Sequence, residues 1–159
     1  MQPFFGGVCM SSLLRKINVI SRCARIYRGN QLTGTDVEPF PHSFAYAICV
    51  HPGFSQEQIA RHLCLNKSMV TRRLAQLEEH GYVTRVTSET DKRVMLVYPT
   101  EKMQEIFPRV REITQNWNRA VSENISDEEM AIFESVLERI EWKARELAGV
   151  SDDCEEEAK

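Results

Sequence analysis

Hydrophobic positions repeat with helical spacing near both ends of the chain. From residue 11 to residue 28, and again after residue 126, apolar side chains recur three and four residues apart, which is the period of an amphipathic helix. The first repeat consists of Leu13, Ile17, Ile20, Ala24 and Tyr27, and the second of Met130, Phe133, Leu137, Ile140, Ala144 and Leu147. Each repeat predicts a helix with one apolar side that needs a partner.

Two shorter helices joined by a tight turn are predicted between residues 55 and 80. Ser55 and Gln58 have the three-residue spacing of a capping box at the start of the first helix. The turn covers residues 64–66, and its last residue, Asn66, is a suitable N-cap for the second helix. The buried side of that second helix is predicted from apolar residues spaced four and three apart, Val70, Leu74 and Leu77.

The pattern changes from helical to alternating after Gly81, which stands where a helix end favours left-handed backbone. Residues 82–87 alternate in polarity and predict a strand, and residues 94–98 predict a second strand that pairs with it. The loop between them contains no apolar side chain and places Lys92 next to Arg93. The stretch 55–99 therefore predicts a helix-turn-helix followed by a β-ribbon wing.

The polar side of the second helix is a candidate for binding DNA. It combines hydrogen-bond donors, cations and one small residue, namely Ser68, Thr71, Arg72 and Ala75, with Lys67 and Arg73 beside them. Such a face suits the floor of the major groove, and a basic wing tip suits the minor groove or phosphates. The alternative is an ordinary solvent-exposed helix face and a solubilising hairpin tip.

Other segments are predicted to surround this stretch. Residues 42–50 are apolar on nearly all sides and predict a buried helix, and the turn-forming residues of 29–39 predict a loop before it. After the wing, Thr100 caps a long helix that Pro108 is expected to kink. The first nine residues show no periodicity, and residues 149–159 predict a solvated acidic tail.

Composition places the chain among globular proteins, with 42% hydrophobic and 27% charged residues in a length of 159. The net charge of −3 would argue against DNA binding if it were spread evenly along the chain. However, residues 1–54 carry +3, residues 55–100 carry +2 and residues 101–159 carry −8, so the acidic residues are concentrated away from the predicted winged helix. The chain has no run of about 18 apolar residues and no signal-peptide pattern. We therefore expect a cytoplasmic protein without a membrane partner.

Chemistry outside the winged helix is sparse. The five cysteines are odd in number and lack C-x-x-C spacing, so neither structural disulfides nor a zinc ribbon is expected. Phosphate-binding glycine loops, nucleophile motifs and meaningful carboxylate pairs are missing from the sequence. We expect no enzyme activity, no catalytic residue and no cofactor.

The run LNKSMVTRRLAQLEEHGYVTR, followed by DKR at residues 91–93, resembles the multiple antibiotic resistance regulator (MarR) family. The resemblance implies a dimeric winged-helix transcription factor, in element order from about residue 13 to residue 147. The family usually follows the second wing strand with Leu-Thr and a nearby glycine, whereas this chain has Tyr98-Pro99-Thr100. This departure concerns only the junction between strand and helix.

The resemblance also implies roles for individual residues. It places Ser68, Thr71 and Arg72 near base edges. Lys67 and Arg73 fall near the DNA backbone. At the wing tip, Arg93 enters the minor groove, and Lys92 lies beside it. Asp91 is expected to orient an arginine rather than to touch DNA. Relatives bind aromatic effectors between the helical dimer and the winged helices, where the candidates here are Tyr27, Phe44 and Tyr46. Simple core packing is the alternative for those three.

Together these features predict a mainly α protein with a small β-ribbon wing, a winged helix-turn-helix at 41–98 flanked by dimerisation helices at 11–28 and 100–148. Two unpaired apolar helix faces favour a homodimer, whose two recognition helices would bind a pseudo-palindromic operator. We expect a repressor released by a small-molecule effector.

Two alternatives remain open at this level. One is a winged-helix interaction or dimerisation module that does not bind DNA. Another is a redox-responsive regulator that uses a cysteine, with Cys23 and Cys49 as candidates and burial as a small hydrophobic residue as the competing interpretation. A zinc-responsive regulator is disfavoured. The zinc-responsive relatives take metal ligands from the helix after the wing, and in this chain no histidine follows residue 80.

Overall fold

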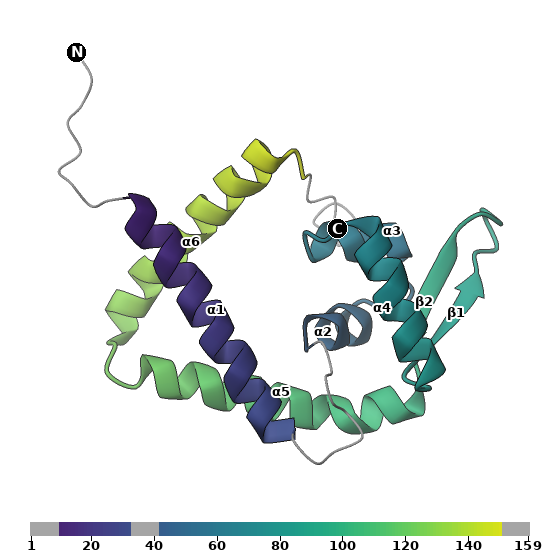
Figure 1. Ribbon diagram of the computed structural model, residues 1–159, viewed down its shortest axis with the longest axis horizontal. Coiled ribbons are helices and arrows are strands. Elements are labelled where there is room, and N and C mark those ends of the chain that lie inside the picture. The colour runs from purple at the N-terminus through teal and green to yellow at the C-terminus, as the bar shows by residue number, and fades with distance from the viewer. Residues whose placement is uncertain (1–9, 33–41, 151–159) are drawn as a thin grey trace.

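A computed structural model describes residues 10–32 and 42–150 (Figure 1). This part of the chain forms six helices and one antiparallel two-stranded sheet, which confirms the predicted fold class. The elements in chain order are α1 (Met10–Leu32), α2 (His42–Val50), α3 (Gln56–His62), α4 (Lys67–Glu79), β1 (Val83–Thr87), β2 (Met95–Pro99), α5 (Glu101–Ser122) and α6 (Asp127–Ala148).

Side-chain caps define where the helices of the helix-turn-helix begin. The Ser55 hydroxyl accepts from the Gln58 amide at 3.2 Å, and the Gln58 side chain accepts from the Ser55 amide at 2.8 Å. The Asn66 side chain accepts from the Met69 amide at 2.8 Å and starts α4. Both predicted N-caps are confirmed, because each satisfies a backbone amide that has no partner within its own helix.

The wing begins one residue later than the sequence pattern predicts. Gly81 follows α4 with φ +74°, as expected for a residue that ends a helix in the left-handed conformation. Strand β1 then pairs with β2 from Val83 opposite Pro99 to Thr87 opposite Met95. The wing is joined to the segment between α2 and α3, because the Gly53 amide donates to the Val97 carbonyl at 2.9 Å.

The hydrophobic core lies within the winged helix, around α2. Phe44, Ala45 and Ile48 of α2 are buried. They belong to one cluster with the predicted apolar side of α4 and with one side of α5. The α4 residues are Val70, Leu74 and Leu77, and the α5 residues are Met103, Val110 and Ile113. Helix α5 is thus part of the core through about its first half, and its second half carries the chain away from the winged helix (Figure 1).

The first helix is longer than predicted. It continues through Gly29 to Leu32, so the predicted helix end at residue 28 and the start of the loop at residue 29 are wrong. Leu32 is only 3% exposed and belongs to the core cluster. Burial of this side chain is worth about 1.5–3 kcal/mol, which exceeds the roughly 1 kcal/mol that a helical glycine costs.

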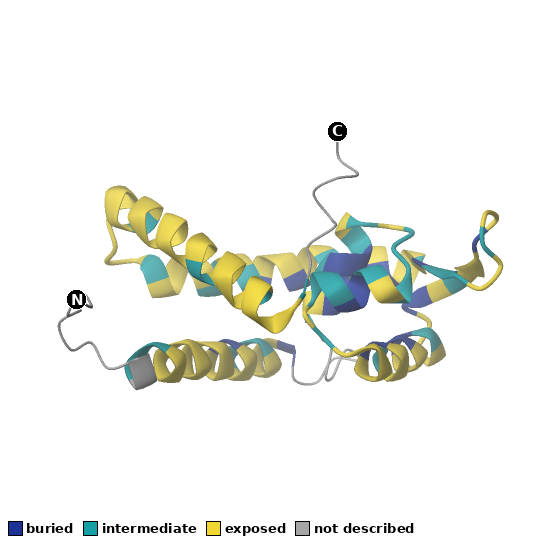
Figure 2. Ribbon diagram, turned by 90° about the horizontal axis from the view of Figure 1, so that it is seen from above, coloured by how far each residue is buried: buried dark blue, intermediate teal, exposed yellow. Residues whose placement is uncertain are grey.

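Helix α6 has no buried residue in the single chain, and most of α1 is exposed as well. Figure 2 shows the buried residues gathered in the winged helix, while α6 is almost entirely exposed. The apolar side chains left open on these two helices include Leu14, Ile20, Ile26, Ile132, Phe133, Leu137 and Leu147. The N-terminal arm, most of the predicted acidic tail and residues 33–41 lie outside the described residues.

None of the described helices is both long enough and apolar enough to cross a membrane.

Candidate nucleic-acid interface

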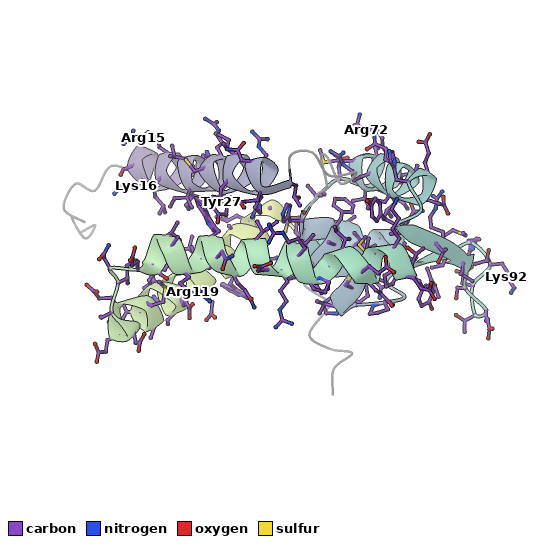
Figure 3. All side chains as sticks on the ribbon, turned by 90° about the horizontal axis from the view of Figure 1, so that it is seen from below. Arg15, Lys16, Tyr27, Arg72, Lys92 and Arg119 are labelled. Atoms are coloured by element: carbon purple, nitrogen blue, oxygen red, sulfur yellow. The ribbon has the colours of Figure 1, made fainter. Side chains whose placement is uncertain are left out.

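Helix α4 separates its buried and exposed residues as its sequence predicts. Val70 and Leu74 are fully buried, whereas Ser68 and Arg72 on the opposite side are exposed. Arg72 points away from the body of the protein (Figure 3). The exposed side therefore offers the Ser68 hydroxyl and the Arg72 guanidinium without a covering element from the described part of the chain.

The cations beside this face are placed differently from one another. Lys67 is exposed in the first turn of α4. Arg73 is half-buried, and its guanidinium donates to the Gln76 side chain at 3.0 Å. This bond directs Arg73 along the helix, toward the next turn.

Thr71 makes a contact that sequence reasoning missed. Its hydroxyl lies 2.9 Å from the Lys67 carbonyl and 3.1 Å from the side-chain oxygen of Gln56 in α3. Gln56 thus sits at the edge of the exposed face of α4. One feature of the sequence could have pointed to Gln56. It lies between Ser55 and Gln58, which form the capping box without it, so its side chain is not needed for capping.

Hydrogen bonds fix the loop at the wing tip. Ser88 is buried, and its hydroxyl accepts from the Asp91 amide at 3.4 Å. Asp91 in turn accepts from the Arg93 amide at 3.0 Å and from its guanidinium at 3.2 Å, and these bonds lower the pKa of the Asp91 carboxyl. Lys92 projects from the tip without the constraint that Asp91 places on Arg93 (Figure 3).

An ion pair connects α4 with the wing. The Arg85 guanidinium of β1 donates to the Glu78 carboxylate of α4, with its Nε at 2.9 Å. The hydrogen bond from Arg85 lowers the pKa of Glu78, and the same bond raises the pKa of Arg85. The pair links the two candidate DNA-contacting elements, and neither residue was selected from the sequence.

The three effector candidates lie where α1, α2 and α5 meet. Tyr27 packs against Trp117 of α5 with ring centroids 5.3 Å apart, and Figure 3 places Tyr27 between α1 and α5. Tyr46 meets Phe107 edge-on at 5.2 Å. Phe44 is buried in the core. All three contribute to packing in the single chain, and an effector role for them stays a prediction.

The described cysteines differ in exposure. Cys23 and Cys64 are exposed, whereas Cys49 is half-buried, and burial raises the pKa of its thiol to about 11. Cys49 is therefore a poor source of thiolate at neutral pH. Within residues 10–32 and 42–150, His, Cys, Asp and Glu side chains do not form a group of three that could hold a metal ion.

These features define a class of protein, a winged helix-turn-helix with long helices outside the winged helix. The family model described as "MarR family" matches residues 46–95, which run from α2 to the start of β2. Over these residues the chain is similar to the MarR family.

Three similar proteins span most of the chain. YybA of Bacillus subtilis (strain 168), described as an uncharacterized HTH-type transcriptional regulator, is 22% identical over 131 residues, which cover 82% of this chain and 87% of that protein. The MarR protein from Peptoclostridium difficile DA00132 has the same fold, with a TM-score of 0.82 at 21% identity over 92% of this chain and 95% of that chain. FabT of Streptococcus pneumoniae, solved in complex with DNA, has a TM-score of 0.71 at 21% identity over 86% and 98% of the two chains.

Proposed function

We propose that the protein is a homodimeric, sequence-specific DNA-binding regulator that acts on transcription in the cytoplasm. The observation that carries the proposal is the exposed polar and cationic side of α4, joined by the Glu78–Arg85 ion pair to a wing with an ordered basic tip. The DNA complex of FabT, which shares the fold, supports the same conclusion.

Each exposed residue receives a role that matches its position. Ser68, Thr71 and Arg72 face the base edges of a major groove, where a bidentate arginine contact to guanine is worth about 1–3 kcal/mol. Lys67 and Arg73, beside the face, contact phosphates. At the wing, Arg93 enters the minor groove and Lys92 adds a phosphate contact, while Asp91 orients Arg93, as its hydrogen bonds to that residue support.

The homodimer is supported by the apolar surface of the terminal helices. Phe133 is 55% exposed, Leu147 is 78% exposed and Ile26 is 60% exposed in the single chain. Large apolar side chains left exposed on two helices favour an interface. A second copy of the chain covers them with matching helices and creates a twofold axis. The dimer then binds two half-sites about one helical turn apart.

Regulation follows from the same geometry. We place a small aromatic effector beside Tyr27, Phe44 and Tyr46, where it separates the ring pairs that join α1 and α2 to α5. A shift at this junction changes the distance between the two recognition helices and releases DNA. The dimer therefore acts as a repressor that blocks a promoter until the effector binds.

The test measures binding of the dimer to labelled DNA from upstream of its own gene, by fluorescence anisotropy at several salt concentrations. Arg72→Ala should weaken binding to the preferred fragment by roughly 5- to 150-fold and reduce sequence preference. Lys92→Ala should weaken all fragments similarly and flatten the salt dependence.

Arg119→Ala is the matched control, because Arg119 lies on α5 far from Arg72 and Lys92 (Figure 3). It should retain wild-type affinity, once gel filtration has shown that it remains a dimer. A folded dimer that prefers no fragment at any salt concentration would contradict DNA-specific function and favour an interaction module.

A further inference from the structure

The hydroxyl proton of Thr71 is already engaged within the protein. The hydroxyl has one proton, and two acceptor oxygens lie in reach, the Lys67 carbonyl at 2.9 Å and Gln56 Oε1 at 3.1 Å. If the Gln56 amide turns by half a revolution, its Nε2 donates to Thr71 Oγ1 and the hydroxyl proton goes to Lys67. In both arrangements the Thr71 hydroxyl donates its hydrogen bond within the protein and not to a DNA base.

The same bond positions a second side chain at the DNA-facing surface. Gln56 is the first residue of α3, and fifteen residues separate it from Thr71 in the chain. The N-terminal cap of α3 is completed by Ser55 and Gln58, so capping does not require the Gln56 side chain. The contact with Thr71 holds the Gln56 amide beside the exposed face of α4.

We propose that Gln56 is a specificity-determining residue of the DNA-binding surface, with Thr71 as the residue that positions it. This inference rests on the proposed DNA-binding function. A glutamine amide has two donor hydrogens and an acceptor oxygen, and the bond to Thr71 uses only part of this capacity. The remainder suits the N7 acceptor and N6 donor of an adenine.

The chemistry of Gln56 distinguishes this role from a phosphate contact. An uncharged amide releases no counterion when it binds, so it contributes little to the salt dependence of affinity. Its contribution should instead appear as a preference for one base pair in each half-site. A purely structural role would alter affinity for all sequences alike.

The experiment selects duplexes from a random pool with the full-length dimer, comparing wild type with Gln56→Ala, Thr71→Val and the control Gln115→Ala. Gln115 is exposed on α5, outside the winged helix. Gln56→Ala should lose the base preference at one position per half-site and bind the wild-type site about 5- to 150-fold more weakly. Its slope of log affinity against log salt should match that of wild type.

Thr71→Val keeps the shape of the side chain but removes the hydroxyl, so it should weaken the preference at the same position. The double variant should lose less than the two single losses combined, because both act on one contact. Gln115→Ala should select the wild-type sequence.

Three outcomes overturn the inference. If Gln56→Ala keeps every base preference, or if it weakens binding to all sequences uniformly, Gln56 does not determine specificity. If wild type itself selects no sequence, DNA-specific function fails and this inference fails with it. Melting temperatures of all variants show whether a loss reflects unfolding, and Thr71→Val provides the second route to the same contact.

Discussion

Gly81→Ala should destabilise the protein by about 1–2 kcal/mol, because a left-handed conformation brings the Cβ of an L-residue against the following carbonyl oxygen. Gly81 has φ +74°, and a Cβ placed there meets no atom within 4 Å. The whole loss is therefore conformational, and it falls at the point where helix α4 leads into the wing.

Two other glycines provide matched comparisons. Gly29 lies in α1, and a Cβ at this position would have no atom within 4 Å, so Gly29→Ala should stabilise by up to about 1 kcal/mol. Gly53 has φ +91°, and its Cβ would lie 3.1 Å from the Tyr98 hydroxyl oxygen. Gly53→Ala adds displacement of Tyr98 to the backbone strain, so it should cost more than Gly81→Ala.

Urea denaturation followed by circular dichroism gives the three changes in free energy of unfolding. Protomer concentration must be held constant, because the stability of a dimer depends on it. The expected order of stability is Gly29→Ala above wild type, then Gly81→Ala, then Gly53→Ala. Equal stability of Gly29→Ala and Gly81→Ala would refute the assignment of a left-handed residue between α4 and the wing.

Three further predictions concern the core, the thiols and pH. Leu74→Ala should lower the free energy of unfolding by about 2–5 kcal/mol in urea denaturation, because Leu74 is fully buried; a loss below about 1 kcal/mol would contradict the packing of α4. Cys49, with a pKa of about 11, should react with iodoacetamide at pH 8 more slowly than exposed Cys64 when peptides are followed by mass spectrometry; equal rates would count against its burial. Arg85 lowers the pKa of Glu78 below its ordinary 4.5, so the pair stabilises the fold above that pH and loses this contribution as pH falls through the lowered pKa. Arg85→Met should therefore be less stable than wild type near neutral pH, and the difference should shrink toward pH 3; a constant difference would show that the ion pair is not its cause.

Features set by neighbouring residues could be predicted from the sequence. The capping box at Ser55–Gln58 and the N-cap at Asn66 are both present, and Gly81 follows α4 with φ +74°. Each of these depends on side chains and backbone groups within about one helical turn. The buried side of α4 was predictable for a similar reason, since helical periodicity alone separates its two faces.

The end of α1 could not be predicted in this way. Gly29 and Asn30 signal a turn, yet the helix continues to Leu32. The deciding interaction is burial of Leu32 in a cluster formed by α2, α4 and α5. Local propensity is worth about 1 kcal/mol per residue, and residues much later in the chain outweigh it here.

The candidate site shows the same division. The exposed face of α4 and the basic wing tip follow from local pattern, whereas the Thr71–Gln56 bond spans fifteen residues and the Glu78–Arg85 pair joins a helix to a strand. Sequence position indicates which residues face outward. The contacts that hold them in register appear only once the elements are packed.

The most direct test of DNA recognition is hydroxyl-radical footprinting of the dimer on DNA upstream of its own gene. Two recognition helices related by a twofold axis should protect two segments about one helical turn apart, with related sequences in opposite orientation. Arg72→Ala should abolish this pattern at concentrations where wild type gives it. Uniform protection, or none, by the folded wild-type dimer would contradict recognition by the exposed face of α4.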